Sequence, residues 1–451
     1  MTSGSQEKIT DDIILVFLKK SRVFTKKYRD KIHNNPLKYF LWDFLTNSKI
    51  QEKALVKCDV LCYNETITTK EGKVFDMSLQ RQIPENMVAN PTVFAMKDTY
   101  QIFMPFSCEV IVWVKVGENT YYDESNGILR SNTNMHRVEV PMEELDRERR
   151  YTVVYRKMIE RKPYFPTSED EVEIDFDFRP VTGDPIRIYH VSDAHNLVKS
   201  PVAAGQYWGE DLDLLVLNGD IPNHSGRIEN FNAVCEIASG ITGGSRPVVF
   251  SRGNHDTRGI YAENFADYTP TDRGRTYYTF RTGNIWGMVL DCGEDKPDGN
   301  AEYGHTICFH QFRLRETQFI KDVIRRAAEE YEAADVKHKL VICHIPFTYI
   351  NHPPFDIEQE LYGEWCALLR DHIKPELLIF GHNHTTKILP VGCEQDHQGQ
   401  PCPAVIGARP FTPNKDRPEE HFHGCALELN GEKIRVVFNA DSGEILEDTV
   451  L

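Results

Sequence analysis

The chain has 451 residues, of which 40% are hydrophobic and 27% are charged, and its formal net charge is −16. This length exceeds what one small hydrophobic core organises and predicts two domains with an extra segment. No stretch approaches the roughly 20 apolar residues that cross a bilayer, and an acidic surface repels the phosphates of nucleic acid. We therefore expect neither a membrane span nor a nucleic-acid partner.

The first residues and the cysteines indicate the compartment. Acids precede a short apolar run at the start of the chain, without a small-residue cleavage site, so this stretch does not look like a secretory signal. The eleven cysteines are an odd number without a recurring spacing, which favours buried thiols over disulfides. We expect a cytoplasmic location.

Residues 1–49 are predicted to form a helical N-terminal segment. Asp11 and Asp12 stand where a helix N-terminus favours acids, and basic residues follow them. Residues 1–50 carry ten Lys and Arg against five Asp and Glu. A basic amphipathic helix fits contact with a protein or a membrane surface. The alternative, favoured by the abundant Leu, Phe and Trp, is a helix packed on the chain's own body.

Residues 50–184 contain short alternating or β-branched runs: TVFAMKD, YQIFMPF, CEVIVWVKVG, HRVEVPM, RRYTVVYRKM and VEIDFDFRP. Turn-forming clusters separate these runs, a spacing that predicts a small all-β sandwich. The segment from Pro180 to Pro185 is a rigid, polar break. We place the domain boundary there, with a second domain at 185–451.

In residues 185–451, strand-like runs alternate with helical segments such as Phe312–Tyr331, as expected for a layered α/β domain. Five polar blocks each follow an apolar run: Asp193-Ala194-His195, Gly219-Asp220, Gly253-Asn254-His255-Asp256, His344 and Gly381-His382-Asn383-His384. Loops at the carboxyl ends of strands converge on one edge of such a sheet. Each block alone could be an ordinary turn, but together they predict one site.

The blocks supply carboxylates, imidazoles and an amide. This mixed nitrogen and oxygen set suits Mn, Fe, Zn or Co, and does not choose among them. Two divalent ions about 3.5–4 Å apart need a shared anionic oxygen ligand, for which Asp220 is the candidate. The expected cofactor is therefore a pair of divalent metal ions.

The order and spacing of the five blocks resemble the calcineurin-like metallophosphoesterase superfamily over residues 186–440. The preceding β region resembles the fibronectin-type-III-like module of purple acid phosphatases and their bacterial relatives. The resemblance implies an α/β fold, a layered β-sandwich flanked by helices. It also implies that Asp193, His195 and His384 complete one metal site around Asp220, and that Asn254, His344 and His382 complete the other.

The implied reaction is hydrolysis of a phosphomonoester or small phosphodiester by attack of a metal-bound hydroxide on phosphorus, because bound water has its pKa lowered toward about 7. His255 resembles the family histidine that protonates the leaving oxygen, and Asp256 is expected to orient it. Asn254 and Arg258 are candidate substrate contacts, since a guanidinium matches a phosphate bidentately. A surface ion pair is an equally good explanation of Arg258.

Two departures from purple acid phosphatases predict the metals. His195 stands where their first block ends in Gly, and Asn223 stands where they carry a tyrosinate ligand. That phenolate holds ferric iron in those enzymes, so we expect a divalent pair here. The polar loop from Glu294 to Asn300 is expected to form the rim of the pocket.

Two other functions remain open. A nuclease-type phosphodiesterase on this scaffold would need a groove lined by basic and aromatic residues. The sequence of residues 186–451 has no pattern that predicts such a groove. A scaffold that has lost catalysis and recruits protein partners would keep the metal ligands without turnover. The presence of His255 favours the enzyme.

Overall fold

The computed structural model of the protein describes residues 67–68, 74–75, 83–124, 126–411 and 420–451. The predicted helical segment 1–49 lies outside these residues. Residues 1–79 form one compact unit and residues 80–451 form another. In the first unit, β1 (Ile67–Thr68) and β2 (Val74–Phe75) pair antiparallel. Within the described ranges, no helix has the length and apolar character needed to cross a membrane.

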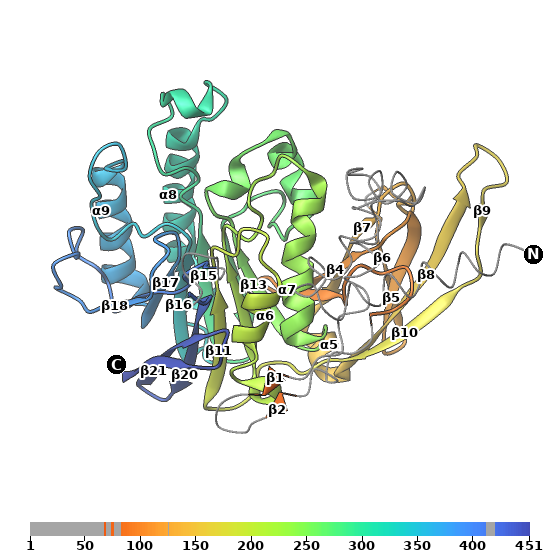
Figure 1. Ribbon diagram of the computed structural model, residues 1–451, viewed down its shortest axis with the longest axis horizontal. Coiled ribbons are helices and arrows are strands. Elements are labelled where there is room, and N and C mark those ends of the chain that lie inside the picture. Colours follow the sequence, from red (N-terminus) through yellow and green to blue (C-terminus); the bar gives the residue numbers. More distant parts are fainter. Residues whose placement is uncertain (1–66, 69–73, 76–82, 125, 412–419) are drawn as a thin grey trace, which may run out of the picture. The chain divides into compact units, whose positions relative to one another are not determined.

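The largest sheet of the second unit has nine strands in the order β22-β21-β20-β11-β12-β13-β3-β4-β7 (Figure 1). Neighbouring strands from β11 to β3 run parallel, and the outer pairs run antiparallel. The bounds are β3 (Thr92–Ala95), β4 (Thr99–Pro105), β7 (Met135–Pro141), β11 (Ile186–Val191), β12 (Leu214–Asn218), β13 (Pro247–Ser251), β20 (His423–Asn430), β21 (Lys433–Ala440) and β22 (Ile445–Val450).

A second sheet has six strands in the order β14-β15-β16-β17-β19-β18. Its central strands, from β15 to β19, are parallel. The bounds are β14 (Tyr278–Thr282), β15 (Ile285–Leu290), β16 (His338–Cys343), β17 (Leu377–Phe380), β18 (Lys387–Leu389) and β19 (Ala404–Ile406).

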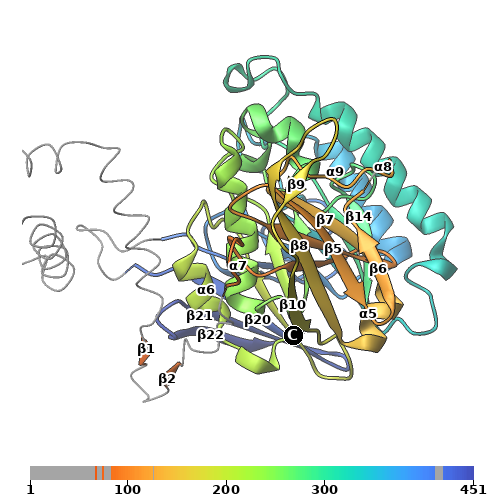
Figure 2. The same cartoon turned by 90° about the vertical axis from the view of Figure 1, so that its right-hand side faces the viewer.

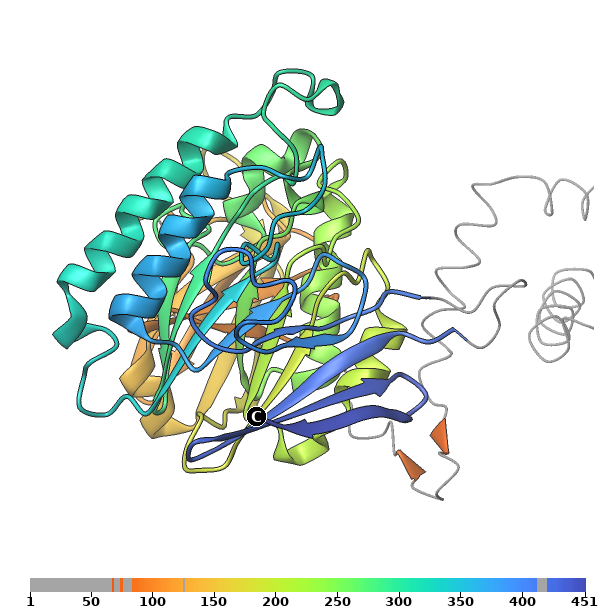
Figure 3. The same ribbon diagram turned by 90° about the vertical axis from the view of Figure 1, so that its left-hand side faces the viewer.

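Helices cover the outer faces of the two sheets. Figures 2 and 3 show the sheets between α6 (Lys199–Gly205) and α7 (Asn232–Thr242) on one side, and α8 (Phe309–Arg325) and α9 (Gln359–Leu368) on the other. The layered α/β fold expected from the sequence is confirmed.

The central strands β12 and β17 are almost entirely apolar, as expected for strands that are buried on both faces. Side chains alternate across a strand, so Leu214 and Val216 of β12 join the core between the sheets. Leu215 and Leu217 join the core beneath the helices α6 and α7. A third core lies between the six-stranded sheet and the helices α8 and α9.

The predicted strands of the segment 50–184 are also present. A third sheet has the order β10-β8-β5-β6, and β9 pairs with β8. Its elements are β5 (Val110–Val116), β6 (Asn119–Tyr122), β8 (Arg150–Glu160), β9 (Thr167–Ser168) and β10 (Val172–Asp177), with the helix α5 (Met142–Glu148) before β8. However, β3 pairs with β13, so backbone hydrogen bonding crosses the predicted boundary at 184/185. The domain bounds stay a prediction.

The helix predicted at Phe312–Tyr331 begins earlier and ends earlier, as α8 from Phe309 to Arg325. The buried Glu330 accepts a hydrogen bond from Trp286 Nε1 at 3.1 Å and lies 3.2 Å from Lys97 Nζ. Glu330 makes these contacts from beyond the end of α8, where tertiary contacts outweigh the helical periodicity of the sequence. The nine described cysteines are free thiols, and most of them are buried, as expected.

The pairing of β3 with β13 predicts that the two regions unfold together. Phe94 of β3 is fully buried and makes edge contacts with Phe103 and Phe250. Phe94→Ala should lower the free energy of unfolding by about 3–5 kcal/mol, measured by urea denaturation, in one transition. Tyr164→Ala, at a site that is 79% exposed, is the control and should change little. Two separated transitions would contradict the shared sheet.

Candidate metal centre

Each of the five polar blocks follows a strand end at the same edge of the facing sheets. The strands β11, β12 and β13 of the nine-stranded sheet precede Asp193, Asp220 and Asn254. The strands β16 and β17 of the six-stranded sheet precede His344 and His382. Three groups of side chains there have ligand atoms within 4.8 Å of one another.

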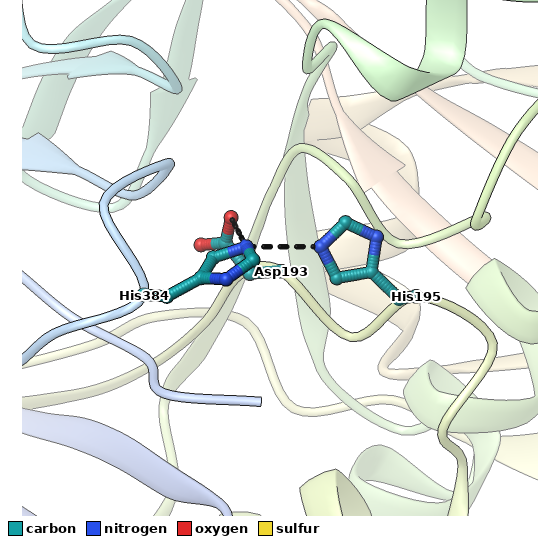
Figure 4. A group of neighbouring side chains, drawn as sticks. All are labelled: Asp193, His195 and His384. Carbon is teal, nitrogen blue, oxygen red and sulfur yellow. Dashed lines mark hydrogen bonds and ion pairs between the residues drawn. The ribbon is translucent and has the colours of Figure 1, made fainter. Parts of the chain in front are cut away.

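The first group is Asp193, His195 and His384 (Figure 4). The Nε2 atoms of His195 and His384 lie 3.1 Å apart, and Nε2 of His384 lies 3.4 Å from Oδ1 of Asp193. Two nitrogens bound to one ion at about 2.0–2.1 Å lie about 3 Å apart. The spacing therefore fits two ligands of a shared ion.

The second group is Asp220, His344 and His382. Nε2 of His344 lies 3.2 Å from Oδ2 of Asp220. The side-chain amide of the buried Asn254 lies 3.0 Å from Nδ1 of His382, so Asn254 belongs to the same side. The third group contains Asp220, His195 and His255. Because His195 also belongs to the first group and Asp220 to the second, Asp220 lies between the first group and the second.

The backbone at this edge adopts an uncommon conformation. Five candidate ligands have positive φ: Asp193 (53°), His195 (45°), Asp220 (53°), His382 (68°) and His384 (50°). Non-glycine residues seldom occupy this region, and such strain concentrates at functional sites. The glycines of the blocks permit close packing, since a Cβ on Gly253 would lie 2.2 Å from Oδ1 of Asp220.

Two buried polar atoms support the fit of metal ions to these residues. Oδ1 of Asp193 and Nε2 of His344 have no hydrogen-bond partner among the described residues. Buried polar atoms are almost always satisfied, and both of these atoms face other members of the groups. The set of imidazole, carboxylate and amide donors suits a divalent transition metal.

The charges of the site are strongly coupled. Burial lowers the pKa of His344, but Asp220 and Asp193 outweigh it and raise that pKa to about 10. Burial would raise the pKa of Asp220, but His344 holds it well below its usual range. By contrast, burial and then His344 lower the pKa of His382 to about 4, so this imidazole is neutral and free to bind a cation.

His255 sits at the mouth of the site, with its side chain 30% exposed. Its Nδ1–H donates to the carbonyl oxygen of Asn223 at 2.9 Å, which fixes the tautomer and directs Nε2 toward Asp220 and Arg258. Nε2 lies 4.0 Å from Oδ2 of Asp220 and 3.3 Å from Nη1 of Arg258.

The expected contact between Asp256 and His255 is wrong. The carbonyl of Asn223 takes that place, while Oδ2 of Asp256 accepts hydrogen bonds from the backbone N–H groups of Gly253 (2.7 Å) and Asp220 (3.2 Å). Asp256 is fully buried. Burial and then Asp220 raise its pKa well above the usual range. The two hydrogen bonds accepted by Asp256 hold the loop of Gly253 against the loop of Asp220.

Arg258 forms an ion pair, which is one of the two roles that the sequence analysis left open for this residue. Its Nε and Nη2 each lie 2.8 Å from a carboxylate oxygen of the buried Glu294. Its Nη1 faces His255. Contact with substrate through this atom stays a prediction.

Sequence reasoning missed Asn218 and Ser192, which support the site, and it placed Asp295 only within the expected rim loop. Asn218 donates from Nδ2 to the carbonyl oxygens of Cys343 (3.3 Å) and Ile379 (3.2 Å) in the facing sheet. Ser192 donates to Oδ2 of Asp193 at 2.6 Å. Oδ2 of Asp295 lies 3.8 Å from Nε2 of His382. The sequence did contain a signal for these three residues, namely their position, because each of them ends or closely follows an apolar strand.

Comparison with known families agrees with this geometry. Residues 186–386 match the sequence model of the family described as calcineurin-like phosphoesterase. The chain carries a calcineurin-like phosphoesterase domain. This family uses a dinuclear metal centre, and the protein is accordingly a metal-dependent phosphoester hydrolase. No curated protein sequence matches the chain.

Solved structures share the fold of this phosphoesterase. The purple acid phosphatase PPD1 of yellow lupin (Lupinus luteus) aligns with a TM-score of 0.51 at 13% identity, over 80% of this chain and 75% of that one. PhoD aligns with 0.48 at 11% identity, over 80% and 88%. A dimetal phosphatase from Danio rerio aligns with 0.42 at 14% identity, over 59% and 99%. At such identities the first similarity shows the fold alone.

The raised pKa of His344 predicts how the metal-free protein responds to pH. Its ordinary pKa is 6.5 and its pKa in the fold is about 10. The protonation of His344 therefore adds its full contribution to the free energy of unfolding below pH 6.5, and this contribution is lost as the pH rises toward 10. The difference in unfolding free energy between wild type and His344→Gln, measured in chelator by urea denaturation, should shrink from about pH 6.5 to about pH 9.5. A difference independent of pH would contradict the coupling.

Proposed function

We propose that this protein hydrolyses a phosphoric ester at a pair of divalent ions, Mn, Fe, Zn or Co, held by Asp193, His195, Asp220, Asn254, His344, His382 and His384. The observation that carries the proposal is the convergence of two ligand groups on one carboxylate. Asp193, His195 and His384 gather on one side, His344 and His382 gather on the other, and Asp220 lies among them. One Asp can bridge two ions in such an arrangement.

Ions bound there would supply Lewis acidity toward the phosphoryl oxygens and would make water acidic enough to act as a nucleophile near neutral pH. The chain supplies the remaining groups. Asn254 is positioned beside His382 and Arg258, where its amide can serve an ion or the substrate. The loops of Asp220 and Asn254 are held together by Asp256, which keeps the ligands in place.

His255 is the proposed proton donor to the leaving oxygen. The carbonyl of Asn223 holds Nδ1, so Nε2 is the nitrogen that faces the site. The adjacent guanidinium of Arg258 and carboxylate of Asp220 set the charge around Nε2. A positioned acid of this kind contributes roughly 10²–10⁴-fold to rate.

The expected cytoplasmic location stays a prediction. The same holds for contact of residues 1–49 with a protein or a membrane surface, and for the absence of a nucleic-acid partner.

Metal-dependent turnover tests the proposed function. The purified protein, stripped with chelator and reloaded with manganese, zinc, ferrous iron, cobalt or magnesium, should hydrolyse p-nitrophenyl phosphate or bis-p-nitrophenyl phosphate, followed by absorbance of the released nitrophenolate. Binding of two ions with no turnover of either ester would favour a scaffold without catalysis. Preferential cleavage of DNA or RNA would favour a nuclease.

Two substitutions separate metal binding from proton donation. Asp220→Asn should lower both metal content and turnover, because it removes the shared anionic oxygen. His255→Ala should keep both ions and lower kcat by about 10²–10⁴-fold. Metal content is measured by plasma mass spectrometry alongside kcat.

The control for these substitutions is Asp335→Asn. The side chain of Asp335 is 67% exposed and pairs with Arg281, near the amino end of β16, whereas the site lies at the carboxyl end. Full activity in the His255 variant would remove His255 from the mechanism.

A further inference from the structure

The hairpin between β8 and β9 extends beyond the sheet to which it belongs (Figures 1 and 2). The strand β8 pairs with β10 as far as Tyr155 and with β5 as far as Lys157. Beyond Met158, its only described pairing partner is the short strand β9. Residues 159–167 therefore project from the body of the fold, and we call them the hairpin tip.

The hairpin tip exposes large apolar side chains. Ile159, Tyr164 and Phe165 are 65%, 79% and 90% exposed, and Phe165 is the most exposed large hydrophobic residue in the described part of the chain. Single exposed apolar residues are ordinary on a protein surface. Two adjacent aromatic rings at the end of a projection are different, because a concentration of exposed apolar surface marks a site of interaction.

The backbone of the tip has little conformational freedom. Pro163 precedes Tyr164, and Pro166 follows Phe165. Each proline fixes its own φ, and Pro166 also favours extended backbone at the residue before it. Phe165 nevertheless has a φ of 57°, in the left-handed region that bulky residues avoid. Strain of this kind concentrates at functional sites, so the two rings are presented on a preorganised turn.

The charges of the tip are basic in balance. Arg161 and Lys162 stand against one acid, Glu160, which lies 2.6 Å from Lys162 Nζ. Two bases and one acid leave a charge of +1, and Arg161 has no acidic partner among the described residues. Two acids of the returning strand pair instead with Arg156 and Lys157, nearer to the sheet. The tip therefore differs in sign from the chain as a whole, whose charge is −16.

We propose that the hairpin tip docks the protein on an anionic lipid surface, with Tyr164 and Phe165 entering the headgroup region and Arg161 contacting the lipid phosphates. Aromatic side chains favour the boundary between water and hydrocarbon, and basic side chains beside them bind anionic headgroups. Charges more than about 8–10 Å away are largely screened at physiological salt, so the acidic body opposes this contact only weakly. Two rings and one unpaired base make a reversible anchor.

Docking through the tip would also orient the protein. Figures 1 and 2 show the tip on the same side of the molecule as the loop that joins β15 to α8. That loop carries Glu294, which engages Arg258, and Asp295, which lies beside His382. The mouth of the candidate metal centre is therefore turned toward the lipid surface when the tip is bound.

Sedimentation with lipid vesicles tests the docking. The full chain should bind vesicles of phosphatidylcholine and phosphatidylserine in a ratio of about 7:3, and should bind phosphatidylcholine alone about fivefold more weakly. Tyr164→Ser/Phe165→Ser should weaken binding to the mixed vesicles by about tenfold, because both rings lose apolar contact. Arg161→Ala should weaken it by about fivefold.

The matched control is Tyr122→Ser, which replaces an aromatic residue of β6 that is 48% exposed, and it should bind like wild type. The double variant should keep the wild-type midpoint of thermal unfolding, because its substituted side chains bury little surface. Chelator should leave vesicle binding unchanged, since the metal centre takes no part in it.

A fluorescence measurement identifies the part of the chain that enters the lipid. Residues 1–50 are also basic in balance, so vesicle binding by the full chain does not by itself identify the tip. Phe165→Trp places a reporter at the tip. With brominated phosphatidylcholine in the mixed vesicles, the quenching of this variant should exceed that of wild type, whose five tryptophans supply the background.

Three outcomes would overturn the proposal. Equal vesicle binding by wild type and the double variant, or no excess quenching in Phe165→Trp, would place lipid contact elsewhere in the chain. Failure of wild type to bind either vesicle would leave a protein groove as the occupant of the tip. Dimerisation in sedimentation velocity that is lost in the double variant, without vesicle binding, would assign the tip to a second copy of the chain.

Discussion

The side chain of Asn218 joins the two sheets at the edge where the metal centre lies. Its amide donates to the carbonyl oxygens of Cys343 and Ile379, at the ends of β16 and β17. The backbone carbonyl oxygen of Asn218 accepts the Nδ1–H of His344 at 2.7 Å. Because these atoms are fully buried, water cannot replace the bonds. The facing sheets are therefore held in the register that brings Asp220 and His344 together.

This geometry creates a site that requires positive charge. Asp193 and Asp220 are buried side by side with few donors, and in the metal-free protein a proton on His344 partly offsets their charge. Two divalent ions would replace that proton and satisfy the buried atoms that lack partners. The left-handed backbone of five candidate ligands is tolerated because packing around the strand ends fixes it.

The N-terminal strands take part in the same architecture. The strands β3, β4 and β7 extend the nine-stranded sheet beyond β13, and the core between the sheets continues into the third sheet. The sheet that carries Asp193, Asp220 and Asn254 is thus supported by residues far upstream in the chain. The rim loop, by contrast, depends on the ion pair of Arg258 with Glu294 and on that of Lys296 with Asp295.

The amino-acid sequence by itself determined the strands before the five blocks and the residue types of the candidate ligands. Local periodicity and the chemistry of carboxylates and imidazoles suffice for that purpose. Only the tertiary structure decided that Asn223, and not Asp256, holds His255, that Glu294 engages Arg258, and that Asp295 faces His382. These contacts join residues 32 to 87 positions apart in the chain, and they depend on loop conformations that a local pattern does not encode.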